Sequence, residues 1–170
     1  MGLEGMLRLL ENVQQEASYV IVFSTGVGVS ALLQEAEKLG RLDELRKALQ
    51  RGTTVCPGAK PLAALKRSGL NSAIQVKEPC TTTEFLSALA PLRLKAQFVV
   101  VLHDGERNRP LVESLLGRCA GLQELLLQKW RLPEDTAPHD RLVKELIGRR
   151  ASATAFTGKM QERHLLGDRP

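Results

Sequence analysis

Hydrophobic residues follow two different spacings along the chain, which predicts helices and strands in regular succession. Apolar residues recur every three or four positions between residues 2 and 16, the spacing of an amphipathic helix. Residues 19–23 (YVIVF) form a continuous β-branched and aromatic run, which is typical of a strand covered on both faces. A Ser-Thr-Gly turn leads into a helix predicted through about residue 39. Gly40 ends that helix, and another begins near Asp43.

The same alternation continues through the rest of the chain. Further strands are predicted at residues 53–56, 73–76, 98–102 and 122–127, and further helices at 61–67, after Thr81, after Pro110 and at 137–147. Thr81 and Glu84 have the spacing of a helix-capping box. Residues 153–156 have the pattern of one more strand. This succession predicts an α/β fold, a flavodoxin-like parallel sheet flanked by helices on both faces.

Three turns after predicted strands are rich in glycine and hydroxyl groups. They hold Ser24, Thr25 and Gly26 after the first strand, Gly58 and Lys60 after the second, and Thr81 and Thr82 after the third. Parallel sheets bind ligands beyond the carboxyl ends of their strands, and helix N-termini there favour anions. Each turn by itself is more typical of a capped strand–helix junction without a ligand. Three such turns on one edge would suit a ligand with several carboxylates.

Side chains with conventional catalytic roles are sparse. His103 precedes Asp104, a pair more typical of a surface hydrogen bond than of an acid–base couple. His139 and His164 have no evident partner, and no GxSxG nucleophile motif occurs. We therefore expect any chemistry to depend on positioning and hydrogen bonding, with no metal and no cofactor.

Charge and cysteine content narrow the classes of partner. The net charge of +5 favours an anionic partner, although a basic surface without a binding role fits equally well. Basic runs such as residues 107–109 are too short for a nucleic-acid-binding arm.

The longest apolar runs are far below the roughly 20 residues that span a bilayer, and no secretory signal is evident. The three cysteines, Cys56, Cys80 and Cys119, lack metal-ligand spacing and are interpreted as buried or half-buried thiols. We expect a cytoplasmic protein without nucleic-acid or membrane partners.

Several blocks of the sequence, in order, resemble the uroporphyrinogen-III synthase family. Residues 22–33 (VFSTGVGVSALL) resemble its F-T-(S/T)-G-x-G-V-x-A-L-L turn, and residues 58–65 (GAKPLAAL) resemble its Gly-x-(Lys/Thr)-x-x-x-Ala-Leu block. Residues 78–82 (EPCTT) are similar to its Glu-Pro-x-Thr-Thr helix start, and residues 130–138 to a stretch of some bacterial members. Residues 155–158 (AFTG) resemble its second strand–turn. The order of the blocks is more specific than any one of them.

This resemblance implies a fold, a reaction and a set of site residues. Members have two α/β domains with the substrate in the cleft between them. Without a cofactor, they cyclise hydroxymethylbilane, a linear tetrapyrrole of porphyrin and heme biosynthesis. Loss of water gives a carbocation, and ring D is inverted through a spiro intermediate. By resemblance, the substrate-binding residues are Ser24, Thr25, Gly26, Gly58, Thr81, Thr82 and Thr157.

The sequence also departs from the family pattern. Gln128 stands where members commonly carry a tyrosine implicated in loss of the hydroxyl. Residues 1–150 resemble the second domain and residues 151–170 a return segment of the first, most of which has no counterpart. An apolar face exposed where that domain docks would favour self-association. The leading hypothesis is therefore a uroporphyrinogen-III synthase. The alternatives are a non-catalytic ligand-binding or regulatory domain of this fold, or a generic anion-binding module.

Overall fold

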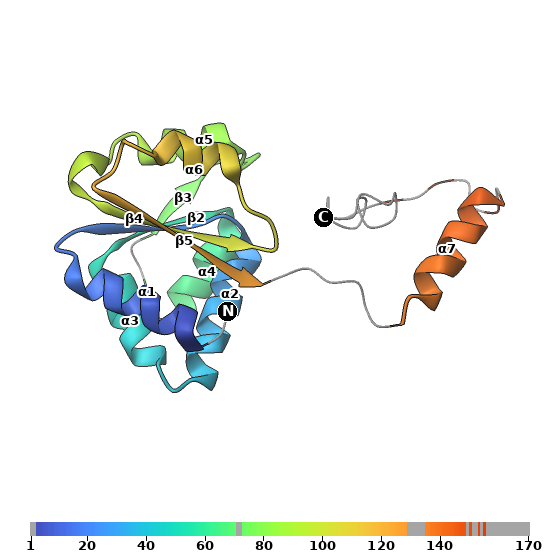
Figure 1. Ribbon diagram of the computed structural model, residues 1–170, viewed down its shortest axis with the longest axis horizontal. Helices are drawn as coiled ribbons and strands as arrows, with labels where there is room; N and C mark the ends of the chain where they lie inside the picture. Colours follow the sequence, from blue (N-terminus) through green and yellow to red (C-terminus); the bar gives the residue numbers. More distant parts are fainter. Residues whose placement is uncertain are drawn as a thin grey trace. The chain divides into compact units, whose positions relative to one another are not determined.

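Five parallel β-strands form one sheet in the computed structural model (Figure 1). The structure describes residues 3–70, 73–128, 135–148, 150, 153 and 155. The chain divides into two units, Met1–Lys129 and Trp130–Pro170, and the sheet belongs to the first. The division into a domain over residues 1–150 and a return segment over residues 151–170 stays a prediction.

The strand order across the sheet is β3-β2-β1-β4-β5, so the first strand lies at the centre. The strands are β1 (Tyr19–Phe23), β2 (Thr53–Pro57), β3 (Ala73–Val76), β4 (Phe98–Asp104) and β5 (Gly121–Gln128). All five residues of β1 are buried, which confirms the prediction that both its faces are covered. In the register of the two central strands, Phe23 lies opposite Leu102.

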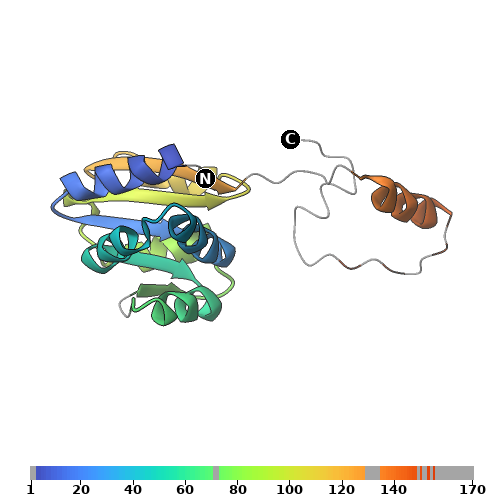
Figure 2. The same ribbon diagram turned by 90° about the horizontal axis from the view of Figure 1, so that it is seen from below.

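Helices cover both faces of the sheet, as the sequence predicts (Figures 1 and 2). One layer holds α1 (Leu3–Gln15), α2 (Gly26–Lys38), α3 (Leu42–Arg51) and α4 (Ala59–Arg67); the other holds α5 (Thr82–Leu89) and α6 (Arg109–Leu115). A short 3-10 helix, η1 (Leu94–Ala96), precedes β4. The fold class, a parallel α/β sheet between two helical layers, is confirmed.

Side chains of the central strands alternate between two hydrophobic cores. On β4, Val100 and Leu102 pack in the core beneath α1–α4, whereas Val99 and Val101 pack in the core beneath α5 and α6. Successive strand residues point to opposite faces. This alternation continues to the end of β4, so the side chains of its last two residues, His103 and Asp104, lie on opposite faces of the sheet.

The described part of the second unit consists mainly of α7 (Ala137–Ile147), which has the predicted bounds. The strand expected at residues 153–156 lies outside the described residues. Among the described helices, none is both long and apolar enough to cross a membrane.

Candidate functional site

The order in which the strands are added to the sheet reverses between β1 and β4. From β1 the chain proceeds through β2 to β3 on one side, then returns to place β4 and β5 on the other. The connections that leave β1 and β4 therefore diverge, and parallel α/β sheets bind ligands in the crevice that such a switch point creates. We call the residues that follow the carboxyl ends of β1, β2, β3 and β4 the carboxyl edge.

The turn after β1 is fixed by hydrogen bonds to β4 and to α2. The Ser24 backbone N–H donates to the Leu102 carbonyl at 3.0 Å. Thr25 caps α2: its Oγ1 accepts from the Gly28 N–H at 3.2 Å and donates to Asp104 Oδ2 at 3.1 Å. The Ser24 Oγ is buried and has no hydrogen-bond partner among the described residues. The Thr25 hydroxyl therefore already has a structural role, whereas no described residue hydrogen-bonds to that of Ser24.

The glycines of these turns have identifiable packing and backbone reasons. A Cβ on Gly26 would lie 3.2 Å from the Pro61 ring, and one on Gly28 would lie 3.1 Å from the Leu127 side chain. These two glycines let α2 approach α4 and β5 closely. Gly58, before α4, has φ +71°, a conformation that side-chain-bearing residues rarely adopt. Packing and turn geometry therefore account for all three glycines without a ligand.

The helix start after β3 has the predicted capping box. Thr81 precedes α5, and its backbone N–H donates to Glu84 Oε2 at 2.8 Å. Hydrogen bonds from the side chain and the backbone of Thr81 lower the pKa of Glu84. The next residue, Thr82, instead donates its hydroxyl to Asn108 Oδ1 at 3.2 Å, which reaches the loop after β4.

The structure places most of the predicted substrate-binding residues along the carboxyl edge. Ser24, Thr25, Gly26, Gly58, Thr81 and Thr82 all follow β1, β2 or β3, which are parallel neighbours. Because adjacent strands lie 4.7–4.9 Å apart, the ends of β1 and β3 are about 10 Å apart. Their role in binding stays a prediction. Thr157 and the side chains of Lys60 and Gln128 lie outside the described residues.

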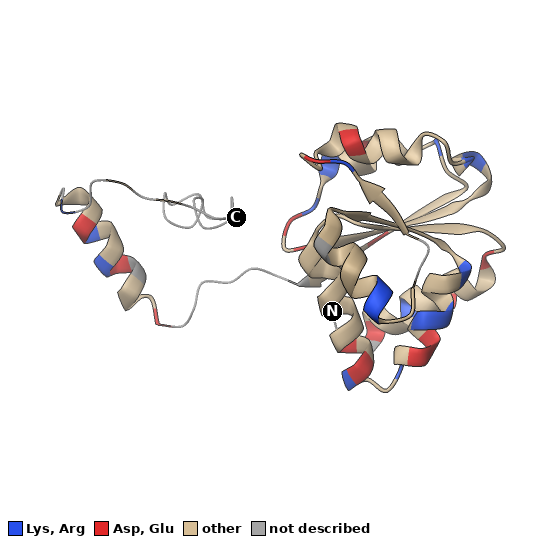
Figure 3. Cartoon of the chain, turned by 180° about the vertical axis from the view of Figure 1, so that it is seen from behind, with Lys and Arg blue, Asp and Glu red and all other residues tan. Residues whose placement is uncertain are grey.

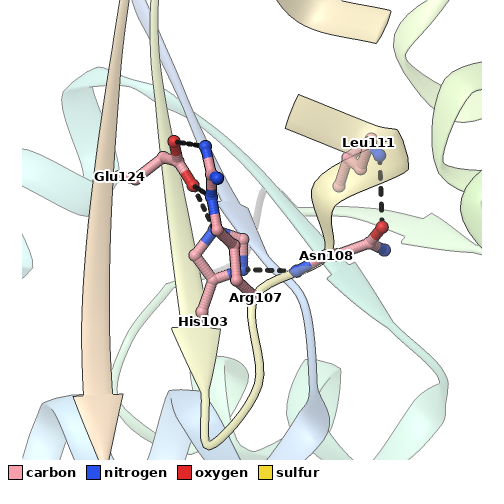
Figure 4. A network of polar contacts seen from close by, with 5 residues as sticks. All are labelled: His103, Arg107, Asn108, Leu111 and Glu124. Carbon is pink, nitrogen blue, oxygen red and sulfur yellow. Dashed lines mark hydrogen bonds and ion pairs between the residues drawn. The ribbon is translucent and has the colours of Figure 1, made fainter. Parts of the chain in front are cut away.

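His103, near the end of β4, belongs to a polar network that the sequence did not predict (Figure 4). Its Nε2 lies 3.1 Å from Glu124 Oε2, and its Nδ1 lies 3.3 Å from the Asn108 backbone nitrogen. Arg107 donates two hydrogen bonds to Glu124, at 2.5 and 2.6 Å. Asn108 Oδ1 also accepts from the Leu111 N–H and so caps α6.

The interpretation of His103 and Asp104 as a surface hydrogen-bonded pair is wrong. Both residues are buried, and their side chains bond to Glu124 and Thr25 respectively. The physical reason is the alternation along β4: neighbouring side chains in a strand point to opposite faces of the sheet.

Geometry determines the proton position on His103. A backbone N–H can only donate, so Nδ1 accepts from Asn108 and the proton of the neutral ring is on Nε2, where it donates to Glu124. Burial lowers the pKa of His103, with Glu124 partly opposing that effect. The Arg107 guanidinium, which hydrogen-bonds to Glu124, lowers the pKa of that carboxyl group. With both ring nitrogens engaged, His103 acts here as a structural link.

Other groups on the described residues offer little further chemistry. Burial raises the pKa of the Cys56 thiol to about 11 and also raises that of Cys119. The three cysteines are free and buried or half-buried, as predicted. The described residues contain no cluster of three His, Cys, Asp or Glu that would hold a metal ion. Acidic and basic residues are mixed over the helices (Figure 3).

Comparison with known proteins gives one curated relative and several solved structures. No family model matches this sequence. Uncharacterized protein YjjA of Bacillus subtilis (strain 168) is 30% identical over 156 residues, which are 92% of this chain and 57% of that protein. This chain therefore spans a little over half the length of that curated relative.

The solved structures are of uroporphyrinogen III synthase from Thermus thermophilus. A wild-type crystal form is 25% identical with a TM-score of 0.59, and a selenomethionine mutant is 24% identical with a TM-score of 0.68. A third structure is 23% identical with a TM-score of 0.54. The matches cover 98% of this chain and 62–63% of the synthase chains. This chain has the α/β fold seen in that synthase.

Proposed function

We propose that this chain belongs to the uroporphyrinogen-III synthase family and that its carboxyl edge binds hydroxymethylbilane during cyclisation to uroporphyrinogen III. The observation that carries the proposal is the line of turns after three adjacent parallel strands, each of which opens a helix, in a fold similar to that of the Thermus synthase. The ordered sequence blocks described above support the same assignment. The proposal includes the reaction of the whole enzyme. In that reaction this chain would form one wall of the cleft that holds the substrate.

The carboxyl edge suits a ligand that carries many carboxylates. The helices α2, α4 and α5 begin there, at Gly26, Ala59 and Thr82. Their first N–H groups and the positive ends of their dipoles favour anions. Because these helices start after adjacent strands, they would bind several carboxylates of one extended ligand together.

The proposed reaction makes modest chemical demands on the protein. The hydroxyl of hydroxymethylbilane takes up a proton and leaves as water. The resulting cation is attacked by the pyrrole at the far end of the same molecule, and ring closure releases a proton. Holding a flexible linear molecule with its two ends together removes much of the entropy cost of ring closure. Positioned hydrogen-bond donors can hold the ligand in this way. No acid–base role is required of His103, whose two ring nitrogens are both bonded within the fold.

A product assay tests the proposal. Purified chain is given freshly prepared hydroxymethylbilane, and the type III and type I uroporphyrinogens are separated after oxidation to porphyrins. We expect type III product above that of a protein-free blank, in which spontaneous closure gives type I. If only type I product forms, the enzymatic proposal for this chain is wrong.

A second candidate function is a non-catalytic tetrapyrrole-binding domain of the same fold. Gln128, at the position of the family tyrosine, is the observation that favours it, because glutamine is no phenolic acid. Equilibrium binding of uroporphyrinogen III under anaerobic conditions separates the two candidates. Binding without type III product supports the second candidate, and absence of binding contradicts both.

A further inference from the structure

Two buried polar atoms at the switch point have no hydrogen-bond partner in the part of the chain that the structure describes. They are Ser24 Oγ, after β1, and Asp104 Oδ1, at the end of β4. Asp104 is only 6% exposed. Buried polar groups in proteins are nearly always paired, and an unpaired one calls for an explanation such as a ligand.

The position of the Asp104 carboxylate is well defined. Its Oδ2 accepts from the Thr25 hydroxyl at 3.1 Å, so one oxygen is anchored to the residue that caps α2. The Asp104 Cβ lies 3.8 Å from the place that a Cβ on Gly28 would occupy, in the first turn of α2. The carboxylate therefore lies at the N-terminus of α2, with one oxygen bonded and the other without a partner among the described residues.

The chemistry of this group restricts the ligand it can meet. A carboxylate oxygen accepts hydrogen bonds and repels other anions. At an edge proposed to bind carboxylates, Asp104 would weaken binding unless the ligand also offered a donor. A linear tetrapyrrole has such donors in its pyrrole N–H groups, which lie along its backbone, whereas its carboxylates are on peripheral side chains.

We propose that Asp104 Oδ1 accepts a hydrogen bond from a pyrrole N–H of the bound tetrapyrrole, with the Ser24 hydroxyl contacting the same part of the ligand. This inference rests on the proposed function and deepens it. The helix starts along the edge would recognise carboxylates in general, and Asp104 selects those polycarboxylates that also carry N–H groups. Asp104 is thus a specificity-determining residue of the edge.

The test compares two probes on matched variants. Uroporphyrinogen III, which has pyrrole N–H groups, and benzenehexacarboxylate, which has carboxylates alone, are titrated anaerobically against the wild type, Asp104→Asn and Asp43→Asn. The Asp104→Asn substitution keeps an acceptor for the Thr25 hydroxyl but removes the charge. Asp43→Asn is the control: it makes the same chemical change at an exposed residue of α3, paired with Arg46, away from the edge.

We expect Asp104→Asn to raise the Kd for uroporphyrinogen III about tenfold, because a hydrogen bond to a charged group is strengthened by that charge. Its affinity for benzenehexacarboxylate should be no weaker than that of the wild type, and Asp43→Asn should bind both probes normally. A Kd for uroporphyrinogen III within twofold of the wild type, or a parallel loss for both probes, would overturn the inference.

A second variant covers the case in which Asp104→Asn does not fold. Ser24→Ala removes the other unpartnered atom and leaves the α2 cap intact, and we expect it to raise the Kd for uroporphyrinogen III about threefold. An unchanged Kd in that variant would contradict the inference. If the wild type itself does not bind uroporphyrinogen III, the proposed function fails and this inference fails with it.

Discussion

At the scale of single residues, His103 joins three parts of the chain. Through its two ring nitrogens it connects β4 to Glu124 on β5 and to Asn108 at the start of α6. Asn108 in turn accepts from Thr82 at the start of α5. One neutral imidazole therefore holds together the loops on the α5–α6 side of the carboxyl edge.

Protonation of His103 should destabilise the fold. A proton on Nδ1 removes the acceptor for the Asn108 N–H, and the folded state lowers the pKa of His103 below its ordinary value near 6.5. The unfolded chain then binds more protons than the folded chain below that pH. The free energy of unfolding should therefore fall as the pH decreases from about 7 to 5.

The variant His103→Asn isolates this effect. Its side-chain oxygen keeps an acceptor for the Asn108 N–H but does not titrate. Urea denaturation of both proteins across this pH range should show a shallower slope for the variant, and the other histidines, common to both, cancel in the comparison. Equal slopes would contradict the assigned role of His103.

Gly52, just before β2, is required by its contact with a buried ring. A Cβ at this position would lie 2.5 Å from Tyr19 Cδ2 and closer still to Cε2. The ring is buried, and its hydroxyl donates to the Ala48 carbonyl at 2.6 Å, so it has little freedom to move. We expect Gly52→Ala to lower the free energy of unfolding by about 1–3 kcal/mol.

A double-mutant cycle checks the cause of that loss. In a Tyr19→Leu background, the ring is absent and Gly52→Ala should cost clearly less. Urea denaturation of the four proteins gives the interaction energy. If the cost of Gly52→Ala is the same in both backgrounds, the clash with Tyr19 is not its cause.

At the scale of secondary structure, the start of α5 depends on the cap at Thr81. Removing its hydroxyl in Thr81→Ala should lower the free energy of unfolding by about 1 kcal/mol, because the first turn loses a capping bond. Thr81→Ser keeps the hydroxyl and should remain close to the wild type in urea denaturation. Equal losses in the two variants would indicate that the methyl group matters and the hydroxyl does not.

Local sequence patterns predicted most elements because their signals are contained within a few residues. The buried run Tyr19–Phe23 and the Thr81–Glu84 capping pair lie where the sequence indicates. The two polar groups at the end of β4 were misread because their partners are distant: Glu124 lies 21 residues from His103, and Thr25 lies 79 residues from Asp104. Only the strand order and the faces of β4 bring those pairs together. Asp104 had a usable signal, its position at the end of the most hydrophobic strand.

At the scale of the whole molecule, the fold gathers several turns along one edge of the sheet, where we propose that the ligand binds. Parallel strands bring turns from distant parts of the sequence to a common edge, and the change of direction between β1 and β4 opens it. The compared synthase structures extend beyond the matched region, since this chain covers 62–63% of them. We therefore propose that this chain recognises one side of the ligand, and binding by the chain tests that role directly.

The most direct test maps the bound ligand onto the sheet by NMR. Backbone amide signals of the isotope-labelled chain are followed as uroporphyrinogen III is added without oxygen. We expect the largest shifts at Thr25, Gly58 and Thr82 on the carboxyl edge, and no shifts at Gly52 and Gln97, which lie at the opposite ends of the strands. Shifts confined to the amino ends of the strands, or no shifts at a saturating ligand concentration, would contradict binding at the carboxyl edge.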